Sequence, residues 1–136
     1  MAKGNEFTPL ELGNIYAKRD WGYAPEYVEG MWRILQVESP DDYVLATGET
    51  NTVKEFVDET YRQIFGRKLM WLGEGLNEKG IDEKTQRTVV TINEKYFRPA
   101  EVDVLVGDFT KAKNVLGWKP ETSLKELISI MINNFK

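Results

Sequence analysis

The feature that most constrains the fold is the combination of short apolar runs with longer segments of helical periodicity. Residues 43–47, 68–72 and 87–92 are apolar runs of strand length. Segments with apolar residues at helical spacing precede, separate and follow these runs. The pattern is typical of an α/β domain, and we expect one domain with a small mixed sheet and about four helices.

Two of the expected helices begin with a capping box. In Thr52-x-x-Glu55 and Ser123-x-x-Glu126, the hydroxyl and the glutamate satisfy backbone N–H groups that a helix start leaves open. Gly66 ends the first of these helices, because glycine adopts the left-handed conformation at a helix C-terminus without strain.

Two further helices are expected from weaker signals. Pro25 suits the first turn of a helix, because that turn needs no N–H from it. Asp108 is predicted to cap another helix, which Gly117 ends. The apolar residues that follow Pro25 at helical spacing are expected to face the core: Tyr27, Val28, Met31, Trp32 and Leu35.

The remaining stretches are predicted from composition. Residues 1–11 have no periodicity and are expected to be a flexible leader, so that the folded domain spans 12–136. A short strand is expected over 102–106. Residues 73–85 are rich in glycine and charge and are predicted to be a surface loop. The spacing of their carboxylates does not match a calcium loop: Glu74, Glu78, Asp82 and Glu83.

Charge and composition exclude several classes of protein. The net charge of −4 argues against a general nucleic-acid or membrane-surface partner, although it leaves room for a local basic pocket. No apolar run has the length of a membrane span. The absence of cysteine and histidine excludes disulfides and the commonest metal ligand and base. We therefore expect a cytoplasmic protein.

The first candidate site is the adjacent pair Lys18 and Arg19, which stands ahead of a predicted helix and is followed by Trp21 and Gly22. Phosphate groups favour fixed positive charge and backbone donors near a helix start. The pair is therefore a candidate anion site. The alternative is a solvated basic pair beside a core tryptophan.

The second candidate site lies around Pro99, which stiffens the chain between Arg98 and Glu101. An arginine can hold a phosphate through two parallel hydrogen bonds, and a carboxylate accepts hydrogen bonds from sugar hydroxyls. The alternative is an internal ion pair between these two side chains.

Four segments together resemble one family of enzymes. They are LGNIYAKRDWGYAPEYVEGMW from Leu12, YVLATGETNTVKEFV from Tyr43, KYFRPAEVDVLVGD from Lys95 and KAKNVLGWKP from Lys111. In this order they resemble the C-terminal, substrate-binding part of GDP-mannose 4,6-dehydratases, which are extended short-chain dehydrogenases/reductases. The first three segments are specific to the GDP-mannose branch.

The resemblance implies roles for the candidate residues. It implies that Lys18 and Arg19 lie near the nucleotide diphosphate, that Arg98 clamps the diphosphate and that Glu101 binds the ribose. It also implies that Asn14 lines the pocket for the base and ribose.

Two positions depart from the family pattern. Lys54 stands where the family has the arginine of a Val-Arg pair, and the resemblance implies that it is a substrate-binding residue. A lysine has a point charge in place of the planar guanidinium, which weakens any bidentate contact carried over from the family. Tyr23 replaces the histidine that is usual in the family.

The resemblance also implies what the chain lacks. Dehydratases of this kind use bound NADP, a glycine-rich turn after a strand, and a tyrosine and lysine four residues apart. The sequence shows neither motif, so we expect no cofactor in this chain and no catalysis by the chain alone. The predicted function is binding of GDP-mannose or a related GDP-sugar. The alternatives are an assembly protein that lost the nucleotide site, or one half of a split dehydratase that needs a separate cofactor-binding chain.

Self-association is expected from the same resemblance. In the resembling enzymes, residues 43–47 and the segment before Lys18 pack against a large parallel sheet that this chain does not encode. Uncovered strands and apolar faces are commonly buried by a second copy, so we expect a homo-oligomer, most simply a dimer. Alternatively, residues 1–12 fold over the gap.

Overall fold

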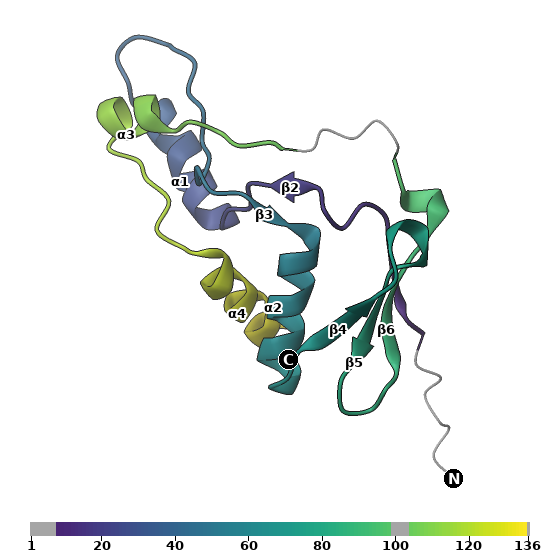
Figure 1. The fold of residues 1–136 in the computed structure, drawn as a ribbon. Coiled ribbons are helices and arrows are strands. Elements are labelled where there is room, and N and C mark those ends of the chain that lie inside the picture. The colour runs from purple at the N-terminus through teal and green to yellow at the C-terminus, as the bar shows by residue number, and fades with distance from the viewer. Residues whose placement is uncertain (1–7, 99–103, 136) are drawn as a thin grey trace.

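The computed structural model describes residues 8–98 and 104–135. Within these ranges the chain forms four α-helices, a four-stranded mixed sheet and a separate two-stranded sheet (Figure 1). The expected α/β architecture is confirmed.

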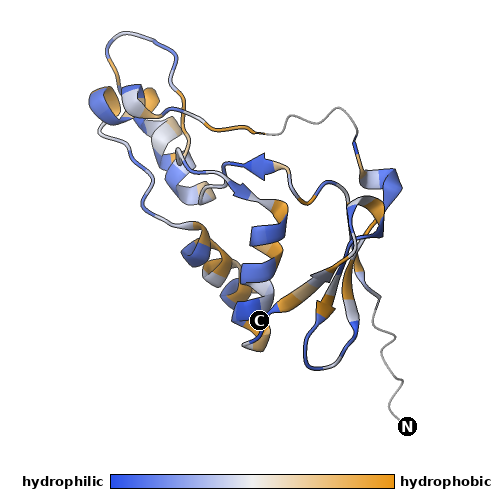
Figure 2. Cartoon of the chain, in the orientation of Figure 1, coloured by the Kyte–Doolittle hydropathy of each residue, from blue (hydrophilic) through white to orange (hydrophobic). Residues whose placement is uncertain are grey.

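The four-stranded sheet has the order β1-β6-β5-β4, and β2 pairs with β3 in the smaller sheet. Strands β4, β5 and β6 are antiparallel neighbours, whereas β1 runs parallel to β6. Figure 2 shows hydrophobic residues on β4 to β6. The strands are β1 Leu10–Leu12, β2 Lys18–Arg19, β3 Asn51–Thr52, β4 Leu69–Leu72, β5 Lys79–Asp82 and β6 Thr88–Ile92.

The strands test three of the sequence predictions. The strands predicted over 68–72 and 87–92 are confirmed as β4 and β6. Strand β1 begins inside the predicted leader, because Leu10 pairs with Val90 across the sheet. Residues 1–7 of that leader lie outside the described residues.

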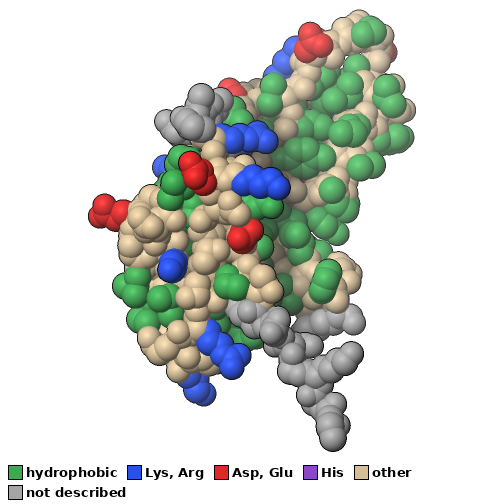
Figure 3. Space-filling model, turned by 90° about the vertical axis from the view of Figure 1, so that its right-hand side faces the viewer, with side chains coloured by type: hydrophobic (Ala, Val, Ile, Leu, Met, Phe, Trp, Pro, Cys, Tyr) green, Lys and Arg blue, Asp and Glu red, His purple; other side chains and the backbone are tan. Residues whose placement is uncertain are grey.

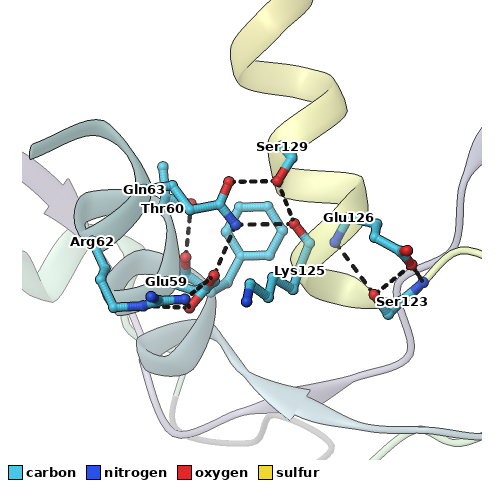
Figure 4. Close-up of polar contacts among 9 residues, drawn as sticks. Glu59, Thr60, Arg62, Gln63, Ser123, Lys125, Glu126 and Ser129 are labelled. Atoms are coloured by element: carbon cyan, nitrogen blue, oxygen red, sulfur yellow. Dashed lines mark hydrogen bonds and ion pairs between the residues drawn. The ribbon is translucent and has the colours of Figure 1, made fainter. Parts of the chain in front are cut away.

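Helix α2 (Val53–Phe65) connects the sheet to helix α4 (Leu124–Asn134). Both predicted capping boxes are confirmed, and Gly66 ends α2 with a left-handed φ of 68°. Tyr61 of α2 is buried with Leu69 and Val90 in the core between helix and sheet. Gln63 joins the two helices by donating to the Lys125 carbonyl at 3.0 Å (Figure 4).

Helices α1 (Ala24–Ile34) and α3 (Thr110–Leu116) form the other end of the molecule and pack around Trp118 (Figure 1). The indole of Trp118 is 2% exposed and donates to the Glu26 carbonyl at 2.7 Å. Asp108 accepts from the backbone N–H of Thr110 at 2.8 Å, one residue before the N-cap of α3.

The prediction that the apolar residues of α1 face the core is wrong for most of them. Tyr27 packs edge-on against Trp118, but the others are 58–80% exposed: Val28, Met31, Trp32 and Leu35. The helix turns its Gly30 side inward, where an added Cβ would lie 2.7 Å from Leu45. That close approach leaves the apolar face of α1 outward.

The prediction of a strand over 43–47 is also wrong. No strand is assigned there, although the segment lies beside Gly107, where an added Cβ would come within 2.3 Å of Ala46. Side-chain contacts hold its end instead: the backbone N–H of Thr47 donates to Asp20 at 2.9 Å. A strand needs a ladder of backbone hydrogen bonds, and the described residues offer this segment none.

The surface loop predicted over 73–85 is wrong in its second half, because β5 lies within it. Glu78 and Asp82 are 3% and 2% exposed. They alternate with outward residues, as strand geometry requires, and their buried charges are paired with Lys54 and Arg67.

A strand is also predicted over 102–106. Among its described residues, 104–106, the structure assigns one isolated β-bridge, from Val104 to Lys18, and residues 102 and 103 lie outside the described residues.

Candidate functional site

The two-stranded sheet brings the predicted basic pair beside the start of α2. Lys18 of β2 lies opposite Thr52, which is the N-cap of α2. The backbone N–H of Lys54 donates to the Ile15 carbonyl at 2.9 Å, so the two segments stay together beyond the strands. Lys18 is exposed, whereas Arg19 is partly buried and donates to the Lys18 carbonyl at 2.7 Å.

Asn14 shapes the turn that leads into β2. Its side-chain oxygen accepts from the backbone N–H of Tyr16 at 3.1 Å, which is the contact of an Asx turn. The amide of Asn14 is therefore used in part to form the loop that carries Lys18 to its place.

A close backbone contact lies just before Arg98 in the chain. An added Cβ at Gly13 would lie 2.0 Å from the Tyr96 carbonyl oxygen, so the chain just before Arg98 lies directly against the chain just before Asn14. Only glycine permits this approach. Arg98 itself is exposed.

The chain after this arginine returns to the same place. Val104 forms a parallel bridge with Lys18, and the Leu105 N–H donates to the Lys18 carbonyl at 3.4 Å. The described residues on both sides of the segment 99–103 therefore contact the stretch 13–18. Glu101 lies outside the described residues, so its predicted role stays a prediction.

Lys54 is brought to this region but is already engaged. Its ammonium donates to Glu78 at 2.7 Å and to the Tyr16 hydroxyl at 3.0 Å. Burial lowers the pKa of Lys54, but these two hydrogen bonds outweigh burial and raise it above its ordinary value. Lys54 therefore stays protonated and is paired with the Glu78 carboxylate within the protein.

A second buried carboxylate, Asp82, has a structural role. It accepts hydrogen bonds from Tyr61 and from Arg67, the latter at 2.7 Å. Burial raises the pKa of Asp82, but those hydrogen bonds and the donors from Lys84 and Thr85 outweigh burial and hold the pKa well below its usual range. This network ties the β5–β6 turn to the end of α2.

One open cleft borders the basic pair. It has a volume of about 370 Å³, and Arg19 and Asp20 stand at its edge. Its walls are mainly apolar and come from the segments 44–46 and 105–107. A cleft of about 500 Å³ between α2, β4 and α4 contains none of the predicted site residues. Among the described residues, no group of three acidic side chains is placed to hold a metal ion.

Glu78 and Tyr16 are the residues at this region that sequence reasoning missed. The available signal was the alternation of Glu78, Gly80 and Asp82, which is the period of a strand with one buried face. This pattern is hard to recognise, because a half-buried strand is normally identified by alternating apolar residues, and here two of the three buried positions carry a charge.

Comparison with known proteins gives a consistent result. A family model described as GDP-mannose 4,6 dehydratase matches residues 1–131. GDP-mannose 4,6-dehydratase of Sinorhizobium fredii is 51% identical over 123 residues, which are 90% of this chain and 35% of that protein. GDP-mannose 4,6 dehydratase of Homo sapiens is 48% identical over 124 residues, which are 91% of this chain and 33% of that protein. The chain thus spans about a third of the length of these relatives.

Solved structures show the same fold at low sequence identity. RMD from Pseudomonas aeruginosa complexed with NADPH matches 93% of this chain and 35% of its own, with a TM-score of 0.68 and 16% identity. UDP-glucose 4-epimerase from Bifidobacterium longum in complex with NAD+ and UDP matches 95% of this chain and 35% of its own, with a TM-score of 0.65 and 19% identity. The fold is therefore that of one part of an extended short-chain dehydrogenase/reductase.

Proposed function

The chain belongs to the GDP-mannose 4,6-dehydratase family, and from that premise we propose that it forms a GDP-sugar-binding portion of such a protein. One observation carries the proposal. The backbone of Tyr96 lies against Gly13, and Val104 bridges to Lys18, so described residues on both sides of 99–103 contact the stretch 13–18. Arg98 lies two residues after the first contact, and Lys18 takes part in the second. A paired set of cations is what a diphosphate requires.

Each residue has a proposed role in this site. Arg98 holds the diphosphate, Lys18 and Arg19 add positive charge beside it, Glu101 accepts from the ribose and Asn14 borders the nucleoside. The exposure of Lys18 and Arg98 supports these roles, because a ligand can reach both side chains.

The described residues do not fit the NADP that the family implies. Gly73 and Gly75 follow β4, but the chain passes through one short 3₁₀ turn (Gly75–Asn77) into β5 and does not open an α-helix there. A dinucleotide phosphate site needs a glycine-rich turn that opens a helix. We therefore assign no step of the dehydration to this chain.

A titration of GDP, GDP-mannose and UDP tests the proposal. We expect GDP ligands to bind at least about tenfold more tightly than UDP, or about 1.4 kcal/mol. The expected preference rests on the three segments that resemble the GDP-mannose branch. Calorimetry would measure both affinities, and equal or absent binding would remove the proposed function.

The outward apolar face of α1 favours a second candidate, a chain that works within an assembly. Val28, Met31 and Trp32 are 58–61% exposed on one side of the helix. Figure 3 shows hydrophobic side chains gathered on the upper part of the molecule, at the height of α1 and α3 in Figure 1, and Figure 2 marks residues 104–106 as hydrophobic. Apolar surface of this kind is commonly buried by another chain.

Sedimentation across a wide range of protein concentration tests this candidate. We expect the chain to self-associate as concentration rises, because burying the α1 face removes apolar area from water. Trp32→Glu should return the protein to monomers, whereas Tyr16→Phe, which keeps that face, should not. A strictly monomeric mass at every concentration would contradict the expectation.

A further inference from the structure

Lys54, Tyr16 and Glu78 form a closed triangle of polar contacts that no sequence motif indicates. Lys54 donates to Glu78 at 2.7 Å and to Tyr16 at 3.0 Å, and Tyr16 donates to the same Glu78 oxygen at 2.8 Å. The three residues come from the turn before β2, the first turn of α2 and the position just before β5. The triangle joins the candidate site to the four-stranded sheet.

Burial makes this arrangement hard to open. The Glu78 side chain is 4% exposed and that of Lys54 is 22% exposed. The ammonium also lies 4.6 Å from the ring centre of Trp71. If Lys54 turned to a ligand, Glu78 would remain as an uncompensated buried charge, which is strongly unfavourable.

The position of Lys54 in its helix adds to the argument. A cation in the first turn opposes the helix dipole, so it gains from a nearby anion. Glu78 already supplies that anion. A phosphate group that binds Lys54 would therefore have to displace the Glu78 carboxylate, because Lys54 already has an anionic partner.

We propose that Glu78 and Tyr16 sequester Lys54 from the anionic ligand, and that Glu78 thereby limits how tightly this site holds a diphosphate. The inference rests on the proposed GDP-sugar site. It revises the role that the family resemblance implies for Lys54: the lysine supports the fold beside the site, and the diphosphate depends on Lys18, Arg19 and Arg98.

The direct test is GDP titration of Glu78→Gln. Releasing Lys54 should tighten GDP binding by roughly tenfold, as expected for one added charge-assisted hydrogen bond. The matched control is Glu74→Gln. Glu74 and Glu78 flank the 3₁₀ turn Gly75–Asn77, but Glu74 is exposed, so removing its charge should change affinity less than twofold. The double variant Glu78→Gln with Lys54→Ala should lose the gain. Unchanged or weaker binding by a folded Glu78→Gln protein would overturn the proposal.

A labelling experiment on the unaltered chain separates this proposal from the proposed function. An amine-reactive reagent should modify Lys54 at least about tenfold more slowly than the exposed Lys125, because Lys54 stays protonated and enclosed. GDP should protect Lys18 and leave Lys54 unchanged. Protection of Lys54 by GDP, or fast labelling without ligand, would overturn the proposal. Slow labelling of Lys54 without any GDP binding would leave sequestration standing and refute the nucleotide site.

Tyr16→Phe provides a second variant if Glu78→Gln fails to fold. Tyr16 is 56% exposed, so removing its hydroxyl should leave the fold intact. Lys54 then loses one of its two hydrogen-bond partners, and its labelling should become faster. An unchanged labelling rate in folded Tyr16→Phe would show that the hydroxyl does not hold the lysine.

Discussion

Replacing Trp118 by alanine is expected to lower the free energy of unfolding by about 3–5 kcal/mol, the usual cost of emptying a large aromatic site in a core. Trp118 is 2% exposed and packs edge-on against Tyr27 and Phe109, with ring centres 5.6 and 6.2 Å away. The loss would be a large part of a small domain's stability. Urea unfolding followed by circular dichroism would measure it.

Two variants bracket this result. Trp118→Phe keeps a ring but loses the hydrogen bond to the Glu26 carbonyl, so a smaller loss is expected. Trp32→Ala removes a tryptophan that is 61% exposed on the neighbouring α1 and should cost under about 1 kcal/mol in dilute solution. Equal losses for Trp118→Ala and Trp32→Ala would mean that Trp118 does not organise the core around α1 and α3.

Arg98→Ala is expected to weaken GDP binding by about 1.5–3 kcal/mol, which is roughly 10- to 150-fold in Kd. The reason is the loss of a charge-assisted, two-pronged contact with the diphosphate. Because Arg98 is exposed, its replacement should leave thermal stability almost unchanged. Calorimetric titration together with a melting curve would measure the two effects separately.

Arg62→Ala is the matched control. Arg62 lies on α2 and pairs with Glu59 at 2.6 Å, so its loss removes an arginine of equal charge from outside the candidate site (Figure 4). GDP affinity should stay within about twofold of the original protein, since a distant exposed charge is largely screened by salt. If both arginine variants bind GDP as the original chain does, Arg98 does not hold the diphosphate.

The sequence allowed part of the candidate site to be anticipated. Lys18, Arg19 and Arg98 were identified because adjacent cations and an arginine beside a proline are visible without knowing the fold. That the three cations form one site is what the family resemblance implies, and it stays a proposal. In the structure, the missing Cβ of Gly13 lets the backbone at Tyr96 approach the stretch before Asn14. The sequence does not reveal which glycine serves such a contact.

The role of Lys54 could not be derived from the sequence. Lys54 and Glu78 come together only when α2 packs against the sheet and the chain entering β5 turns Glu78 inward. The stretch 73–85 is charged and glycine-rich and has no repeating apolar face, so its composition predicts a surface loop. The ion pair between Lys54 and Glu78 instead stabilises the glutamate in a buried position.

The sequence alone determined those helix ends that depend on contacts between residues a few positions apart. The capping boxes at Thr52 and Ser123 and the left-handed glycines at 66 and 117 fix helix ends through contacts between near neighbours, so the sequence alone defined them. The tertiary structure alone decided which faces are buried. The apolar side of α1 faces outward because Gly30 packs inward, and residues 43–47 form no strand because a strand requires partners elsewhere in the chain.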